Sequence, residues 1–401
     1  GIDIGTSKVS SVIAEINNFN QLEIIAIAEC KCFGMKKTKI TDEDEIASAI
    51  GKTISEVEAQ GNIKINSAYV TIPGKYVQIV QNSIVKEARD KFAGITSKDI
   101  NSAMLQLRDI DLPDDKVVID LIKNQFILDN GRTVEDPVGA LSSTVTVTGQ
   151  VILADKDYVR QLTNIFKKAN IEIDGIIPNV LAERSLILDV NEMNDNVMIL
   201  DIGAGNTDIG VFNGSNFVYA NTIPLGGDNI TNDIAQVFYI SEEEADRLKK
   251  QYALALKSFI DNDTDIMLTT YKGDERNKVI KSSELIEVIE ARIEEIFSLV
   301  NKQITSLGIK SNINNVILTG QGITCISKSD VAGKIVLNIP VKIATGRMIS
   351  TVKPAYRSSY ALVRYVSSRP YAKNVASKID VKSNENFFKT ILERIKEFFY
   401  T

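Results

Sequence analysis

The sequence predicts an α/β fold of two similar lobes, and two observations support this prediction. An acidic residue followed by a turn rich in glycine and hydroxyl side chains opens the chain, at residues 3–8 (DIGTSK). A similar segment recurs about halfway along, at residues 201–207 (DIGAGNT). Each segment leads into a strand-like run of apolar residues. Two such turns can face each other across a cleft, so the pattern indicates a duplicated, nucleotide-binding architecture.

The length and composition restrict the class of protein. A chain of 401 residues is too long for one compact core and fits two or more domains. Its hydrophobic content of 44% and charged content of 24% are ordinary for a soluble globular protein. A net charge of −6 gives no reason to expect a nucleic-acid partner. The chain has no histidine, which excludes catalysis or metal binding by that side chain.

Cysteine usage and the lack of long apolar runs indicate a reducing, cytoplasmic compartment. The three cysteines, Cys30, Cys32 and Cys325, form neither a disulfide framework nor a zinc-binding pattern. The sequence shows no signal peptide and no apolar run of about 18 residues. Because the first motif begins almost at Gly1, we expect the first strand to begin before this residue.

Periodicity predicts the elements of the first half. In order, they are strands at 9–16 and 23–29, a helix at 42–60, a strand at 67–72, a helix at 158–169, a strand at 171–177 and a helix at 179–190. The intervening segment 82–155 differs, with one short helical pattern at 97–107 and several strands separated by turn signals. We expect it to form a small inserted α+β subdomain.

The second half repeats the alternation of strands and helices. The predicted elements are strands at 197–200, 209–212, 215–223 and 315–318, and helices at 230–237, 241–256 and 282–307. Asp228 is the expected N-cap of the first of these helices. Residues 366–384 are rich in Ser, Lys and Asn and predict a flexible linker.

The last residues of the chain predict an amphipathic helix at 385–401. Large apolar side chains recur with helical spacing on one face, namely Phe387, Phe388, Ile391, Leu392, Ile395, Phe398 and Phe399. Following a flexible linker, such a helix suits a membrane-surface anchor. Its alternatives are a helix that docks on the globular body and a contact between subunits. The apolar area of the two Phe-Phe pairs favours the membrane.

The two turns contain the residue types that phosphate and magnesium binding require. Glycine lets backbone N–H groups approach a phosphate without a Cβ in the way, and Ser and Thr hydroxyls add donors. Asp3 and Asp201 suit Mg²⁺, which prefers oxygen ligands and retains water. One copy of the motif is equally typical of a plain hairpin turn, and the second copy makes the binding interpretation the stronger one.

These motifs resemble those of the actin/Hsp70/sugar-kinase superfamily, and within it the chain is similar to the FtsA family of actin-like cell-division proteins. Besides the two phosphate segments, the turn at 319–322 (TGQG) and the Gly226-Gly227 pair before a helix match the superfamily pattern. Residues 223–235 and 286–304 resemble two further FtsA segments. The insert ending at 136–139 (DPVG) and the terminal helix are the more specific similarities.

The resemblance implies an actin-like (ribonuclease H-like) fold of two lobes with ATP and Mg²⁺ between them. It also implies a division of the chain. The first lobe comprises 1–81 and 156–195, the insert 82–155, the second lobe 196–240 and 313–365 with an outer subdomain at 241–312, the linker 366–384 and the membrane-targeting helix 385–401.

The resemblance also assigns residues to the site. Asp3 and Asp201 would organise the metal through water. The expected nucleotide-binding residues are Gly5, Thr6, Ser7 and Lys8 from the first lobe, and Gly203, Gly205, Asn206, Thr207, Gly226, Gly227, Lys249, Gly320, Gln321 and Gly322 from the second. Lys249 is equally compatible with a solvated helix face. Gln321 replaces a glycine that is usual in relatives and would be strained if its φ were positive.

The function that the resemblance implies is structural. ATP binding would favour filaments, the terminal helix would attach them to the inner membrane, and the lobe at about 240–312 would bind the C-terminal peptide of the tubulin-like protein FtsZ and recruit other division proteins. We expect slow ATP hydrolysis at most and assign no catalytic base, because Asn179 is short and Glu183 is expected to point elsewhere. The alternatives are a sugar or acetate kinase and a PilM-like peptide-binding adaptor.

Overall fold

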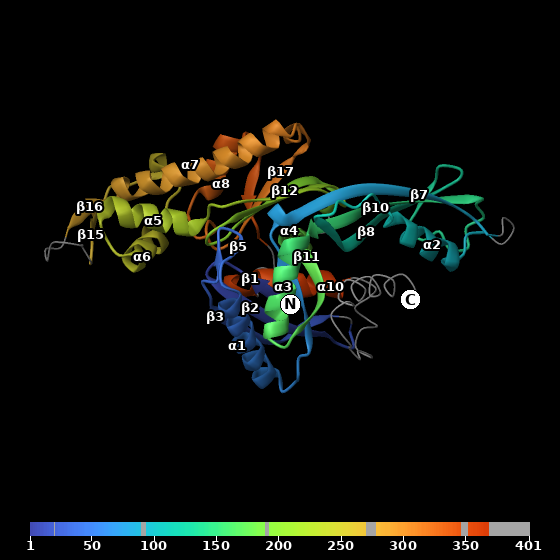
Figure 1. Ribbon diagram of the computed structural model, residues 1–401. Coiled ribbons are helices and arrows are strands. Elements are labelled where there is room, and N and C mark those ends of the chain that lie inside the picture. Colours follow the sequence, from blue (N-terminus) through green and yellow to red (C-terminus); the bar gives the residue numbers. More distant parts are fainter. Residues whose placement is uncertain (20, 90–93, 189–191, 270–277, 346–351, 369–401) are drawn as a thin grey trace.

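The computed structural model describes residues 1–19, 21–89, 94–188, 192–269, 278–345 and 352–368. Figure 1 shows a first lobe around β1–β3, a second lobe around β12 and β17, and an insert that extends sideways along β7 and β10. The predicted amphipathic helix at 385–401 and most of the predicted linker lie outside the described residues. Among the helices that the structure describes, none is long and apolar enough to cross a membrane.

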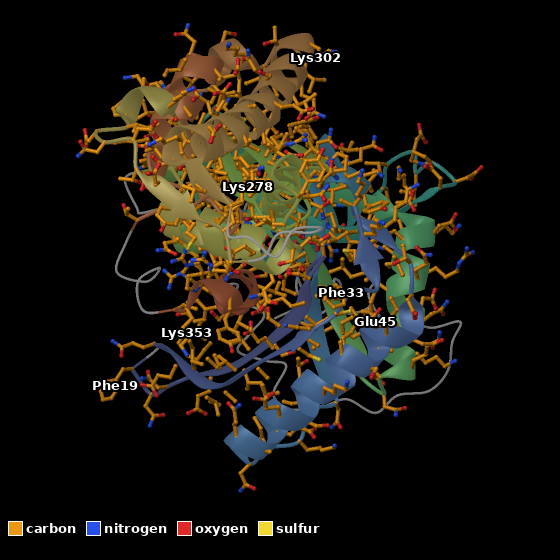
Figure 2. The ribbon with its side chains drawn as sticks, turned by 90° about the vertical axis from the view of Figure 1, so that its left-hand side faces the viewer. Phe19, Phe33, Glu45, Lys278, Lys302 and Lys353 are labelled. Carbon is orange, nitrogen blue, oxygen red and sulfur yellow. The ribbon has the colours of Figure 1, made fainter. Side chains whose placement is uncertain are left out.

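The first lobe is built on a five-stranded sheet in the order β11-β6-β1-β2-β3. The strands are β1 (Ile2–Ile4), β2 (Lys8–Ile16), β3 (Leu22–Lys31), β6 (Ser67–Ile72) and β11 (Glu172–Pro178). The predicted hairpin and the strands at 67–72 and 171–177 are confirmed. Phe19, at the tip of the β2–β3 hairpin, projects from the body of the lobe (Figure 2) and is 84% exposed.

Helices cover both faces of this sheet. They are α1 (Glu43–Gly61), α3 (Lys156–Lys168), α4 (Asn179–Ile187) and α10 (Arg357–Ser367). Successive residues of a strand point to opposite faces, so neighbouring residues of β2 contact helices on opposite sides of the sheet. The hydroxyl of Ser11 is 2.8 Å from that of Thr53 in α1, whereas the hydroxyl of Ser10 is 3.1 Å from that of Ser359 in α10.

The second lobe repeats the plan of the first. Its sheet has the order β14-β13-β12-β17-β18. The strands are β12 (Asn196–Ile202), β13 (Thr207–Asn213), β14 (Asn216–Ile223), β17 (Asn315–Thr319) and β18 (Val341–Ile343). As β1 pairs antiparallel with β2 and parallel with β6, so β12 pairs antiparallel with β13 and parallel with β17. The duplication predicted from the two motifs is therefore present in the topology.

The helices of the second lobe correct two details of the prediction. They are α5 (Gly227–Phe238), α6 (Glu242–Tyr252), α7 (Ser282–Ser306) and α8 (Ser329–Leu337). The N-cap of α5 is Gly226, not Asp228, because α5 begins one residue before Asp228. Helix α6 ends before residue 256, because Ala253 and Ala255 form backbone hydrogen bonds with Ser327 instead of continuing the helix.

The insert is a separate layer with its own apolar core. Its sheet has the order β7-β10-β8-β9, and α2 (Ser97–Leu107) covers it. The strands are β7 (Val77–Glu87), β8 (Lys116–Leu128), β9 (Thr133–Val134) and β10 (Thr144–Asp155). The helix predicted at 97–107 is confirmed, and Thr96 caps it in a reciprocal pair with Asp99.

Shorter elements complete the described chain. They are the strands β4 (Met35–Lys36), β5 (Lys39–Ile40), β15 (Asp265–Met267) and β16 (Val279–Lys281), and the 3₁₀ turns η1 (Gly74–Tyr76), η2 (Glu192–Asn194), η3 (Lys257–Phe259), η4 (Lys310–Asn312) and η5 (Pro354–Tyr356).

Helix α10 differs from the division of the chain that we expected. Residues 357–365 were assigned to the second lobe, but α10 packs on β1, β2 and β6 of the first sheet and against α4. Tyr360, Ala361 and Leu362 are buried in that core. The chain therefore returns to the first lobe after β18. The other domain boundaries stay predictions.

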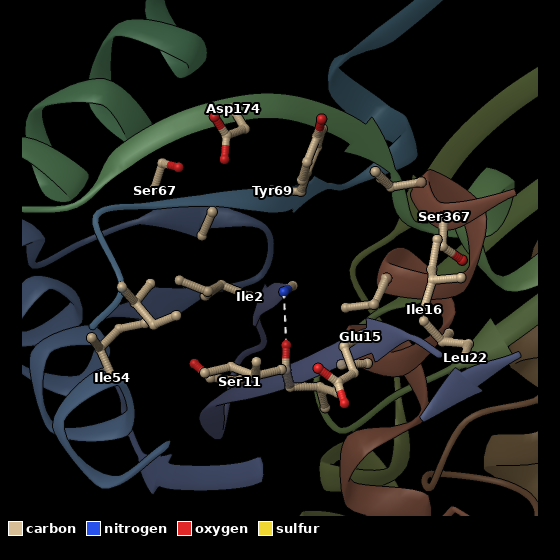
Figure 3. A pocket seen from close by; sticks show the side chains of 18 residues that line it. Ile2, Ser11, Glu15, Ile16, Leu22, Ile54, Ser67, Tyr69, Asp174 and Ser367 are labelled. Carbon is tan, nitrogen blue, oxygen red and sulfur yellow. Dashed lines mark hydrogen bonds between the residues drawn. The ribbon is translucent and has the colours of Figure 1, made fainter. Parts of the chain in front are cut away.

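A cavity of about 680 Å³ lies next to the N-terminal end of β1 in the first sheet (Figure 3). Residues 12–16 of β2 and 67–69 of β6 line it, and the N-terminal amine of Gly1 donates a hydrogen bond to the Val12 carbonyl at 2.9 Å. Because β2 and β6 both flank β1, this cavity is a gap between strands of the sheet and is separate from the cleft between the lobes.

One buried side chain joins the insert to the second lobe. Gln150 of β10 is fully buried, and its amide accepts a hydrogen bond from Phe217 N at 2.9 Å and donates one to Phe217 O at 2.6 Å. The Gln150 side chain thus pairs with the β14 backbone as a neighbouring strand would.

We predict that Gln150→Ala lowers the free energy of unfolding by about 1–3 kcal/mol, because it leaves the buried N–H and C=O of Phe217 unpaired. Urea unfolding followed by circular dichroism measures the change. The control is Gln81→Ala, at the exposed position directly opposite on β7, for which we expect a change within about 0.5 kcal/mol. Equal effects of the two substitutions would contradict this role of Gln150.

Candidate functional site

The two glycine-rich turns have the same internal geometry and lie against each other. Gly5 N donates to Lys8 O at 2.9 Å in the first turn, and Gly203 N donates to Asn206 O at 2.8 Å in the second. Across the gap between the lobes, Gly205 N donates to the Thr6 hydroxyl at 2.9 Å. The structure therefore brings together two segments that are about 200 residues apart in the chain.

A cavity of about 140 Å³ lies between these turns. Of the predicted residues, those that line it are Asp3, Gly5, Thr6, Ser7, Lys8, Asp201, Gly203, Asn206, Gly320 and Gln321. The other lining residues are Asn179, Glu183, Ala204, Thr319, Pro354, Ala355, Arg357 and Ser358. The predicted residues that do not line it are Gly205, Thr207, Gly226, Gly227, Lys249 and Gly322.

Acidic side chains meet at this cavity. Asp3 accepts a hydrogen bond from the Thr71 hydroxyl at 2.7 Å, and Asp201 accepts one from the Asn179 amide at 2.7 Å. Burial, together with the negative charges of Asp208 and Asp3, raises the pKa of Asp201 to about 7. Burial also raises the pKa of Asp3. The site therefore disfavours negative charge, which a bound cation would compensate.

The pair of acids fits a magnesium ion of the kind that the resemblance implies. Within the described ranges, no three acidic or cysteine side chains form a ready-made metal site. Mg²⁺ is commonly held by one or two carboxylates together with water and phosphate oxygens. Asp3 and Asp201, on equivalent strands of the two sheets, supply such a pair.

Several polar atoms around the cavity are buried without a partner among the residues that the structure describes. They are Asn179 Oδ1, Glu183 Oε2, Asn206 Oδ1 and Arg357 Nε. A buried polar atom without a hydrogen bond costs free energy, so such atoms mark a place where a polar ligand fits. All four residues line the same cavity.

Glu183 points into the site, contrary to the expectation that it would point elsewhere. It is 2% exposed, and Ser358 Oγ donates to its Oε1 at 3.2 Å. Burial and the charges of Asp201 and Asp3 raise its pKa well above the usual value. The sequence contained one signal for this position, since Glu183 lies four residues after Asn179 and thus on the same face of α4.

Glycines behind the second turn permit a very close approach of three backbone segments. Gly227 N donates to Gly203 O at 2.9 Å, and Gly322 N donates to Ile202 O at 2.8 Å. A Cβ on Gly227 would lie 2.7 Å from the Gly322 Cα. Gly227 and Gly322, which do not line the cavity, form the support of the turn.

The turn after β17 resolves the question of strain at Gln321. The residue with positive φ is Gly320, at +91°, and Gln321 is absent from the left-handed region. The Gln321 side chain is exposed at the rim of the site. The substitution of glycine by glutamine therefore causes no backbone strain here.

Lys249 does not lie on a solvated helix face. Its side chain is buried, and its ammonium donates to Gly227 O at 3.1 Å and to the Thr231 hydroxyl at 2.6 Å, with Asp246 Oδ1 at 3.1 Å. It links α6 to the N-terminus of α5, next to the glycine support of the second turn.

Comparisons with known proteins identify the family. A model of the FtsA cell-division family matches residues 198–361, and a model of the SHS2 domain inserted in FtsA matches residues 74–153. The cell division protein FtsA of Bacillus subtilis (strain 168) is 30% identical over 364 residues, which cover 91% of this chain and 82% of the relative. The chain belongs to the FtsA family. The FtsA of Escherichia coli (strain K12) is 24% identical over 380 residues, which cover 91% of this chain and 89% of that protein.

Solved structures confirm the actin-like fold of this FtsA family member. The chain is similar to a PilM–PilN type IV pilus biogenesis complex (TM-score 0.60, 14% identity, 92% of this chain and 97% of that one). It is also similar to MreB5 of Spiroplasma citri bound to ADP (TM-score 0.53, 15% identity, 94% and 98%) and to a MamK double helical filament (TM-score 0.51, 11% identity, 91% and 97%). At these identities the likeness shows the fold alone.

We predict that Gly322→Ala destabilises the protein by about 1–3 kcal/mol or more, because its Cβ would collide with the Gly203 carbonyl. Thermal and urea unfolding measure the change. Gly51→Ala is the matched control, since Gly51 lies within α1 with open space around it, and alanine there should stabilise the helix by up to about 1 kcal/mol. A neutral Gly322→Ala would show that the glycine support tolerates side chains.

Proposed function

We propose that this protein binds ATP and Mg²⁺ in the cleft between its lobes. The observation that supports this most directly is the pairing of two equivalent turns, joined by the hydrogen bond from Gly205 N to the Thr6 hydroxyl. Backbone N–H groups of glycine-rich turns are suited to phosphates. The two acids beside the turns supply metal ligands, and the unpartnered polar atoms of the cavity supply further hydrogen bonds.

We assign the residues the following roles. Asp3 and Asp201 hold the metal, partly through water. Residues 5–8 of the first turn and Gly203 and Asn206 of the second hold the phosphates, while Gly205 and Thr207 fix the shape of the second turn. Gly320 and Gln321 approach the nucleoside, Gly226, Gly227 and Gly322 support the turns behind it, and Lys249 orders the helix termini.

We propose slow ATP hydrolysis at most. Catalysed hydrolysis requires a group that orients the attacking water. Asn179 and Glu183 each keep one oxygen without a partner at the cavity. The Asn179 amide cannot take up a proton, and the raised pKa of Glu183 disfavours the carboxylate form that could. Nucleotide binding then serves mainly to set the arrangement of the lobes.

The protein is proposed to act as a scaffold in cell division. Membership of the FtsA family supports head-to-tail assembly of copies into filaments, a heterologous contact that propagates. The sequence at 385–401, with its apolar face, would bind the inner surface of the cell membrane at the division site. Many weak membrane contacts on one filament add up to strong attachment. We propose that the FtsZ C-terminal peptide binds the outer subdomain at 241–312. Other division proteins are then recruited to the filament.

We predict that Asp201→Asn weakens Mg²⁺-dependent ATP binding about tenfold or more, because the metal loses a charged ligand. The same change should leave thermal stability unchanged or higher, since it relieves repulsion among buried acids. Isothermal titration calorimetry with Mg-ATP measures the affinity. Asp111→Asn, at an exposed position of the insert, is the control. Equal affinity of the two variants would refute the metal role.

We predict that the chain forms filaments on lipid vesicles in the presence of Mg-ATP, and that deletion of 383–401 removes them from the membrane. Electron microscopy and co-sedimentation with vesicles containing anionic lipid measure both. Ile391→Glu, on the apolar face, should act like the deletion, whereas Lys389→Gln, on the polar face, should retain most binding. Undiminished vesicle binding without the tail would overturn the anchor. Transfer of phosphate to a sugar would favour the kinase alternative.

A further inference from the structure

The floor of the nucleotide cavity is made by the two segments through which the chain crosses between its lobes. Helix α4 leads from the first sheet to β12, and η5 with α10 returns from β18 to the first sheet. Each crossing contributes polar side chains to the cavity, Asn179 and Glu183 from α4 and Arg357 and Ser358 from α10. These four residues lie outside the two glycine-rich turns.

Hydrogen bonds hold the two crossing helices together as one unit. Ser358 Oγ donates to Glu183 Oε1 at 3.2 Å, and both residues line the cavity. One turn further along, Arg364 Nε donates to Ser185 O at 2.8 Å, and Ser185 Oγ donates to Ala361 O at 3.4 Å. The position of Arg357 at the start of α10 is therefore set by α4.

Arg357 brings a positive charge to the cavity. Its Nε is buried and has no partner among the described residues. Burial lowers the pKa of Arg357, and the negative charge of Glu183 acts in the opposite direction. The other cationic side chain that lines the cavity, Lys8, is paired with Glu29 at 3.0 Å on the outer strand. The guanidinium is thus the better placed cation for an anion inside the cavity.

The surroundings of Arg357 indicate which part of a nucleotide it meets. Glu183, which interacts with Arg357, also interacts with Asp201 and Asp3. Those two acids are the proposed metal ligands and line the same cavity as Arg357, and a metal held there would accompany the outer phosphates of a nucleotide. Arg357 therefore belongs to the metal end of the cavity. A planar guanidinium binds phosphate oxygens strongly and directionally.

We propose that Arg357 is a ligand of the terminal phosphate, which Glu183 and Ser358 position, so that the crossing helices distinguish ATP from ADP. The inference rests on the proposed nucleotide site. With a terminal phosphate present, Arg357 donates to its oxygens from the position that Glu183 and Ser358 fix. With a diphosphate, those oxygens are absent, and Arg357 retains only the electrostatic influence of Glu183.

The test compares affinities for Mg-ATP and Mg-ADP by isothermal titration calorimetry. Arg357→Gln should weaken ATP binding about tenfold or more, the loss expected for a hydrogen-bonded charge pair, and change ADP binding by about threefold or less. The ATP affinity of Arg357→Lys should lie between those of the unchanged protein and of Arg357→Gln, because a point charge replaces the planar guanidinium. Arg132→Gln, at an exposed position of the insert, is the control and should keep the ratio of the two affinities.

A double-mutant cycle tests the positioning role of Glu183. Glu183→Ala should weaken ATP binding in the otherwise unchanged protein and add little to Arg357→Gln, because its effect acts through the guanidinium. Equal losses for ATP and ADP in Arg357→Gln, or no loss, would overturn the inference while leaving the nucleotide site intact. Binding of neither nucleotide by the unchanged protein would refute the nucleotide site itself and the inference with it.

Discussion

The gathering of carboxylates between the two lobes is the constraint on which the rest of the site depends. Asp3, Asp201 and Glu183 line one small cavity, and Asp208 adds its charge close by. Burial and mutual repulsion disfavour their ionised forms, and the pKa of Asp208 is raised to about 6. A bound cation would reverse that balance by stabilising the carboxylates, and it would also attract phosphate oxygens. The buried acids are thus the groups that the proposed metal–nucleotide complex would stabilise.

The lobes are joined by two kinds of contact. Apolar packing occurs where α4 meets strands of both sheets, and Val180 lies against Gly210 of β13. Polar contacts occur at η1, where Gly74 N donates to Asp208 at 3.3 Å and Lys75 N donates to the Thr222 hydroxyl at 3.0 Å. Because Asp208 and Gly210 lie on the same strand, the two kinds of contact are neighbours.

The sequence predicted local structure and the duplicated motifs well and missed contacts made between distant segments. The apolar runs of β2 and β3, the helical spacing within α1 and the two acid–glycine turns are all readable from neighbouring residues. Arg357 and Glu183 are separated by about 170 residues, and no local pattern indicates that α10 returns to the first lobe beside α4. The N-cap of α5 was misassigned for a related reason, because Gly226 is selected by its close approach to Gly203 and Ala204 rather than by its own propensity. Contacts between distant segments therefore determine both the place of Arg357 beside Glu183 and the N-cap at Gly226.

The long strands of the insert have a mechanical consequence. Strands β7 and β10 are paired along eleven register positions and leave the body of the molecule together, while Gln150 attaches them to β14 near the middle of the pairing. The part beyond Gln150 extends about 20 Å at the usual rise per residue. A rotation of about 5° at Gln150 would displace its tip by about 2 Å, with the same rise per residue. The insert therefore acts as a lever that converts small rotations at β14 into larger displacements at its far end.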